Sequence, residues 1–165
     1  LYPPEPFAEV YEAARALGLR TSAHAGEAAG PESIRGAVEA LKVDRIGHGI
    51  AAHADESVMA LLAETQVPIE LCPLSNVATG SLAGIEDHPV RQFWDAGLML
   101  TVNTDDPGMF HNSMVEEFVV LHDVFGFDRA QIKTFILNGV AASWQTAEQR
   151  AAMATAFQAA PAWQS

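Results

Sequence analysis

The chain has 165 residues, of which 49% are hydrophobic and 18% are charged, and its formal net charge is −12. This composition is typical of one folded domain of ordinary size with a substantial core, and it excludes a disordered chain.

The same figures limit the partners and the location of the protein. A strongly acidic chain repels polyanions, so we expect no nucleic acid partner. No run of about eighteen apolar residues occurs, so we expect no membrane contact. The single cysteine, Cys72, rules out an internal disulfide and suits a reducing compartment. We therefore expect the protein in the cytoplasm, and the sequence leaves its oligomeric state open.

Helices and strands alternate along the chain up to residue 106. The expected elements are a helix over 6–18, a strand leading into His24, a helix over 33–42, a strand over 43–47, a helix over 55–66, a strand over 69–72, a helix from His88-Pro89 to 97 and a strand over 98–103. Three helices should follow, over 112–125, 129–143 and 147–158. The last two begin with capping-box patterns, Asp128-x-x-Gln131 and Thr146-x-x-Gln149.

Four strand–helix units predict an α/β fold with a parallel sheet, because strands covered by helices on both faces read as apolar runs. A closed (β/α)8 barrel needs eight strands and about 250 residues. A small open sheet would also accommodate four strands. We favour the C-terminal half of such a barrel, with four parallel strands, covering helices and a C-terminal helical tail. Residues 1–165 would then be a single partial domain, and the isolated segment should be only marginally stable.

Polar and ionisable residues follow each of the four strands. They occur in LRTSAHAGE (19–27), VDRIGHG (43–49), VPIELCPLSN (67–76) and LMLTVNTDDP (98–107), and they include His24, Glu27, His48, Ser75, Asn76, Asp105 and Asp106. The successive intervals from His24 to His48, from His48 to Ser75 and from Ser75 to Asp105 are 24, 27 and 30 residues, and each is about the length of one strand–helix unit. Function gathers at the carboxyl ends of parallel strands. The sequence therefore predicts an active-site face.

Each motif also has a structural interpretation. His24 and Glu27 would be a buried histidine and a helix-entry acid, with Gly26 turning the backbone. A lone histidine such as His48 is more often structural than catalytic. The pair Asp105-Asp106 before Pro107 would begin a helix.

Together, the motifs favour chemistry. Histidine and carboxylate at separate strand ends supply ligands suited to zinc or a related divalent ion. A second histidine and a further glutamate remain as base and acid for activating a water molecule. Nothing in the chain resembles a nucleophile elbow, a phosphate loop or a dinucleotide fingerprint.

The motifs HAGE, RIGHG, CPLSNVATG with the later HP, and TDDP occur in the order and spacing of the adenosine deaminase family, which this chain resembles over nearly its whole length. That family is a zinc-dependent branch of the amidohydrolase-type barrels. The resemblance implies that His24 and Asp105 are zinc ligands and that Glu27 gives a proton to the purine N1. It implies that His48 assists formation of the attacking hydroxide. Substrate would contact Gly26 and Asp106, which holds the base through N7, with Ser75, Asn76 and Thr79-Gly80 in support.

The chain departs from the family pattern in one respect. The family's first strand carries an H-x-H pair that supplies two more zinc ligands, and no H-x-H occurs here. Truncation is the simplest explanation, since the chain begins where the family's fifth unit would begin. A degenerate, non-catalytic relative is the other.

The resemblance therefore implies one Zn²⁺ per full-length subunit and a purine nucleoside as the small-molecule partner. The expected reaction is hydrolytic deamination of an aminopurine nucleoside, adenosine to inosine and ammonia, with the fragment alone inactive. The alternatives are a deaminase of adenine, aminofutalosine or AMP, a non-catalytic barrel fragment or pseudoenzyme, and another metal hydrolase such as an amidase.

Overall fold

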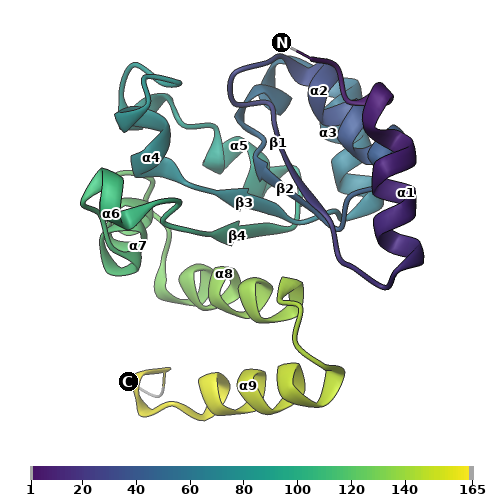
Figure 1. Cartoon of the computed structure of the whole chain (residues 1–165). Coiled ribbons are helices and arrows are strands. Elements are labelled where there is room, and N and C mark those ends of the chain that lie inside the picture. Colours follow the sequence, from purple (N-terminus) through teal and green to yellow (C-terminus); the bar gives the residue numbers. More distant parts are fainter. Residues whose placement is uncertain (1, 164–165) are drawn as a thin grey trace.

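The structure, a computed structural model, describes residues 2–163 of the chain. Four strands form one sheet near its centre (Figure 1). They are β1 (Ser22–Ala25), β2 (Arg45–His48), β3 (Ile69–Leu71) and β4 (Leu100–Val102). All neighbouring pairs are parallel, and the strands lie in their sequence order. The predicted parallel α/β fold is confirmed.

Helices connect the strands and continue after the last one. They are α1 (Ala8–Ala16), α2 (Pro31–Gly36), α3 (Glu56–Thr65), α4 (Pro73–Ala78), α5 (Val90–Asp95), α6 (Pro107–Phe110), α7 (Met114–Asp123), α8 (Arg129–Ala142) and α9 (Ala147–Ala159). A π-helical segment, Ala37–Leu41, extends α2. Helix α8 packs along β4, and α9 packs on α8 at the far end of the molecule (Figure 1).

The helix starts follow local chemistry. Asp128 and Thr146 accept hydrogen bonds from the backbone N–H groups of Gln131 and Gln149, whose side chains accept in return. Both predicted capping boxes are therefore confirmed. Asp55 caps α3 in a similar way, by accepting from the N–H groups of Ser57 and Val58.

Two short helices follow strands β3 and β4. The first was not expected from the sequence, and the second matches the structural interpretation of Asp105-Asp106 as a helix start. Both begin with a proline, Pro73 in α4 and Pro107 in α6, which suits the first turn of a helix. The prediction of a strand over 69–72 was one residue too long, because β3 ends at Leu71 and Cys72 caps α4. Cys72 is buried.

The core lies between the sheet and its helices. Strand side chains on the helix-facing side, such as Ile46, Ile69 and Leu100, are fully buried with Ile34 and Leu62 of the helices. Successive strand residues point to opposite faces. Gly47 and Glu70 therefore face the other side of the sheet, where they line a cavity.

Both edges of the sheet remain open within residues 2–163, because β1 and β4 each pair with one neighbour. Beside β1 lies a hollow of about 400 Å³ lined in part by Phe7, Tyr11 and Ala23. Beside β4 lies an apolar groove of about 350 Å³, bordered by Val102 and Phe157. Exposed edges with apolar margins are what a partial barrel leaves uncovered. No helix among the described residues is long and apolar enough to cross a membrane.

The turn after β1 constrains one glycine. Gly26 has a φ of +71°, and a Cβ at this position would lie 2.4 Å from Cδ1 of Ile34. Its N–H donates to Ser33 Oγ and its carbonyl accepts from the N–H of Ala51, each at 2.8 Å. Any side chain here would meet both backbone strain and a packed core.

We expect Gly26→Ala to destabilise the protein by about 1–2 kcal/mol through its backbone conformation and by a further ~1–3 kcal/mol through overpacking. Urea denaturation measures both. Gly18→Ala is the matched control, since Gly18 has a φ of +79° with no atom within 4 Å of a built Cβ. Equal losses in the two variants would contradict the packing argument.

Candidate active site

The carboxyl ends of β1 and β2 bring two histidines together. His24 pairs with Gly47 in the sheet register, and His48 is the last residue of β2. A Cβ at Gly47 would lie 2.6 Å from Cδ2 of His24, so the missing side chain makes room for the His24 ring. The rings of His24 and His48 meet edge to face, with centroids 5.0 Å apart.

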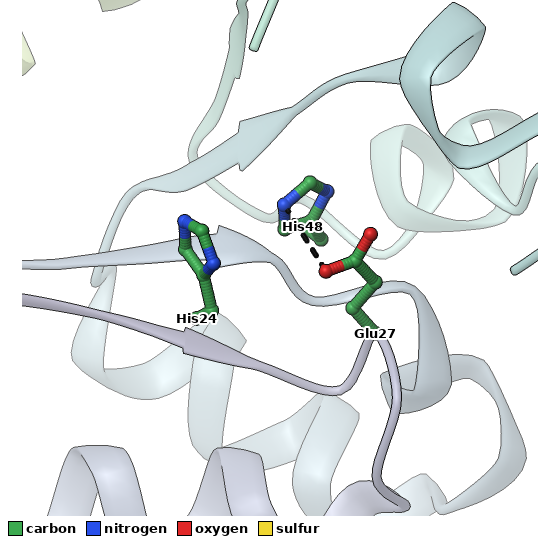
Figure 2. Close-up of side chains that lie close together, drawn as sticks. All are labelled: His24, Glu27 and His48. Carbon is green, nitrogen blue, oxygen red and sulfur yellow. Dashed lines mark ion pairs between the residues drawn. The ribbon is translucent and has the colours of Figure 1, made fainter. Parts of the chain in front are cut away.

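Glu27 joins this pair from the turn after β1. Figure 2 shows the three side chains facing one another, with Glu27 directed at His48. Oε2 of Glu27 lies 3.4 Å from Nε2 of His48. Each of His24, Glu27 and His48 offers a ligand atom within 4.8 Å of the other two. We call these three residues the site cluster.

Asp105 approaches the site cluster from the end of β4. Its Oδ2 lies 3.9 Å from Nε2 of His48 and accepts a 2.6 Å hydrogen bond from Ser75 Oγ. Asn76, like Ser75, is fully buried on α4, and its Nδ2 lies 3.1 Å from Nδ1 of His48. Side chains that follow all four strands therefore meet at one end of the sheet.

His48 is buried and its surroundings favour the neutral ring. Burial lowers the pKa of His48 below its ordinary value, and the charge of His24 acts in the same direction, while Glu27 and Asp105 oppose them. With the Asn76 amide donating to Nδ1, the proton of the neutral ring is on Nε2. That proton then faces the carboxylates of Glu27 and Asp105.

The backbone is strained at two of these positions. His48 has a φ of 65° and Asp105 a φ of 59°, in the left-handed region that residues other than glycine rarely adopt. Such conformations cost on the order of 1–3 kcal/mol each and concentrate at functional sites.

Two of the predicted site residues, Asp106 and Gly26, make hydrogen bonds that serve the fold. Asp106 is exposed and its Oδ1 accepts from the N–H of Met109, so it caps α6 as its structural interpretation held. Gly26 is buried, and both of its backbone polar groups are bonded within the fold. The assignment of both residues to substrate binding stays a prediction, as do the roles of the others.

A cavity of about 270 Å³ opens beside the two histidines. Its lining includes residues that the sequence reasoning missed, namely Glu70, Asn103, Thr104 and Met114. Glu70 could have been noticed in the sequence, because an acidic residue inside a short apolar strand needs a partner. Its carboxylate pairs with Arg45 at 3.2 Å. Ser81 donates to Oε1 of Glu27 at 3.4 Å, and no sequence pattern indicated this contact.

The donor set suits a metal ion. Imidazole nitrogen and carboxylate oxygen are ligands that zinc accepts, and the site cluster places three such donors close together. The carboxylate of Asp105 lies beside them and adds a fourth donor group. The residues present therefore fit a divalent cation at this end of the sheet.

The sequence profile of the family described as "Adenosine deaminase" matches residues 2–160. The chain belongs to the adenosine deaminase family.

Individual family members give the same relationship. An adenosine deaminase of Clostridium acetobutylicum is 39% identical over 147 residues, which cover 89% of this chain and 44% of the relative. The crystal structure of an adenine deaminase from Arthrobacter aurescens superposes with a TM-score of 0.90 at 34% identity, covering 94% of this chain and 48% of the other. An amidohydrolase from Burkhoderia ambifaria with bound Zn has a TM-score of 0.86 at 33% identity, with 94% and 44% covered.

The chain thus spans about half the length of the family members that it matches. Its four parallel strands form a partial barrel, in agreement with the fold predicted from the sequence.

A further histidine, His88, is buried outside the site cluster. It is 3% exposed, its Nδ1 accepts from the N–H of Val90 at 3.1 Å, and its Nε2 has no partner among the described residues. Burial lowers the pKa of His88 to about 4, and the charge of His48 adds to this effect. The folded protein therefore holds this ring neutral where an unfolded chain would begin to protonate it.

The unfolded state binds more protons at this position between about pH 6.5 and 4, so the free energy of unfolding should fall as the pH falls through that range. We expect His88→Asn, which keeps an acceptor for Val90 but does not titrate, to reduce this pH dependence. Urea denaturation at several pH values measures it. His111→Asn, at an exposed position, is the control, and an identical pH dependence in wild type and His88→Asn would refute the prediction.

Proposed function

We propose that this chain forms the C-terminal half of a (β/α)8 barrel, as one partial domain, and that the complete barrel deaminates an aminopurine nucleoside, with adenosine as substrate. The observation that carries the proposal is the convergence of His24, Glu27, His48 and Asp105 at the carboxyl ends of neighbouring strands, in a member of the adenosine deaminase family.

We assign zinc to this site. His24 and Asp105 would hold the metal, with the remaining ligands supplied by the other half of the barrel. A zinc ion acidifies a bound water molecule and so provides a nucleophile at neutral pH. The bound Zn of the Burkhoderia ambifaria amidohydrolase supports this choice.

The chain's own residues would handle the protons and the base. Addition of water at C6 of a purine requires a proton at N1, and Glu27 is the donor that we propose. Ser81 and His48 hold the two oxygens of its carboxyl group at 3.4 Å each. His48, fixed by Asn76, would stabilise the charge that develops beside it. Asp106 and the backbone at Gly26 would contact the base.

The cavity lining favours an uncharged nucleoside over a nucleotide. Among the described residues that line it, Glu70 and Asp105 are acidic and none is lysine or arginine. The nearby Arg45 is held by Glu70 and lies over the Trp144 ring at 3.9 Å. A phosphate would therefore find no free cation on this wall of the site.

The proposal is tested by joining this chain to the N-terminal half of the Clostridium acetobutylicum relative in one polypeptide. The joined protein should bind stoichiometric zinc and release ammonia from adenosine faster than from adenine or AMP. The 165-residue chain alone should bind zinc weakly and show no turnover, because two protein ligands are too few for a tight site.

Each other result has a distinct meaning. Stoichiometric zinc with adenosine turnover by the chain alone would overturn the half-barrel proposal. Faster turnover of adenine than of adenosine would identify the free base, and not the nucleoside, as the substrate. A joined protein that folds and binds zinc without any turnover would identify a pseudoenzyme.

The role of Glu27 is tested in the same joined protein. Glu27→Gln keeps the shape of the side chain but cannot transfer the proton, so kcat should fall by ~10²–10⁴-fold, as expected when a general acid is lost, with zinc content unchanged. His24→Ala should lose the metal as well. Glu64→Gln, at an exposed position on α3, is the control. Near-normal kcat in Glu27→Gln would show that the proton comes from another group.

A further inference from the structure

Glu117 is a fully buried acid on α7, a helix that contributes none of the proposed catalytic residues. Its oxygens accept hydrogen bonds from two neutral donors. Oε1 accepts from Asn112 Nδ2 at 2.7 Å, and Oε2 accepts from the backbone N–H of Leu74 at 3.3 Å. The carboxyl group is therefore held between two different segments of the chain.

Both segments lead directly to the site. Leu74 precedes Ser75 on α4, and Asn112 Nδ2 also donates at 2.9 Å to the carbonyl of Thr104, which precedes Asp105. Ser75 Oγ in turn donates to Asp105 at 2.6 Å. The hydrogen bonds close a ring from Glu117 through Leu74 and Ser75 to Asp105, and back through Thr104 and Asn112.

We propose that Glu117 is a positioning residue that sets the spacing between the segment after β3 and the segment after β4, and thereby holds Asp105 in place for metal binding. This inference rests on the proposed function, because it takes Asp105 as a ligand. Glu117 lies outside the lining of the cavity and would act through Ser75 and Asp105.

Only a carboxylate satisfies both contacts. Each of its oxygens faces an N–H donor, so a glutamine at 117 would turn its own NH₂ group against either Leu74 N–H or Asn112 Nδ2. Asn112 cannot resolve the conflict by flipping its amide, because its oxygen would then face the carbonyl oxygen of Thr104. One arm of the ring must break in Glu117→Gln.

The acid is retained at a cost to the folded state. Burial raises the pKa of Glu117, although the hydrogen bonds from Leu74 and Asn112 act to lower it. A purely structural role would be filled as well by a neutral side chain that avoids burying a charge. The cost is explained if the two acceptor oxygens are needed to align the segments.

The experiment compares Glu117→Gln with wild type in the joined protein, and Glu116→Gln is the matched control. Glu116 is the exposed neighbour on the same helix, and its side chain accepts a hydrogen bond from Ser113 Oγ. We expect Glu117→Gln to weaken zinc affinity about 10-fold or more, the scale of lost outer ligand support. A chelator competition assay measures this, and excess zinc should restore kcat.

Backbone hydrogen exchange separates positioning from general destabilisation. Backbone amides of residues 74–76 and 104–106 should exchange faster in zinc-free Glu117→Gln than in Glu116→Gln. The exchange rates of the α3 amides and the thermal midpoint should be the same in the two variants. Asn112→Ala is the second variant, to be used even if Glu117→Gln does not fold. It removes both hydrogen bonds of the Asn112 side chain, to Thr104 and to Glu117, and keeps the one from Leu74 to Glu117, so it should weaken zinc affinity in the same direction.

Zinc affinity and exchange that match the control in both variants would overturn the proposal. Uniformly faster exchange with a lower thermal midpoint would also overturn it, since Glu117 would then serve stability alone. Affinity and exchange are read without turnover. An inactive joined protein would count against the proposed function. An active joined protein whose Glu117→Gln and Asn112→Ala variants keep normal zinc affinity and exchange would count only against the role of Glu117.

Discussion

Parallel pairing of four short strands is the constraint on which the rest of this structure depends. Because neighbouring strands run in the same direction, their carboxyl ends lie along one edge of the sheet, and whatever follows each strand is delivered to the same place. The register is equally important. It sets His24 level with Gly47, and the absence of a side chain there lets the His24 ring lie against β2 and reach His48.

The site is built from features that oppose stability. His48 and Asp105 adopt left-handed backbone conformations, and His88 and Glu117 are ionisable groups enclosed in the core. Hydrogen bonds link His48, Asp105 and Glu117 to α4, and His88 accepts from the N–H of Val90. A buried polar network of this kind holds its members in one arrangement when its bonds are made. We interpret it as a supporting layer beneath the residues that would meet metal and substrate.

The exposed sheet edges agree with the finding that the chain spans about half the length of the family members that it matches. Among the described residues, strands β1 and β4 have open edges, with a hollow beside β1 and an apolar groove beside β4. In a closed barrel, further strands would pair with these edges and further helices would fill the grooves. The two proposed metal ligands lie on the same edges, since His24 belongs to β1 and Asp105 follows β4.

The sequence by itself determined the alternation of strands and helices, the capping boxes at Asp128 and Thr146, and the polar strand ends that carry His24, His48, Ser75 and Asp105. These features follow from local composition and spacing, which are visible along the chain. Only the tertiary structure decided which groups face each other. It put Glu27 against His48, turned Asp106 into a helix cap, and enclosed Glu117 between Leu74 and Asn112. The short helix α4 likewise escaped prediction, because its six residues carry too little periodicity. Contacts between residues 43 positions apart, such as Leu74 and Glu117, depend on how the elements pack, and no local pattern records that packing.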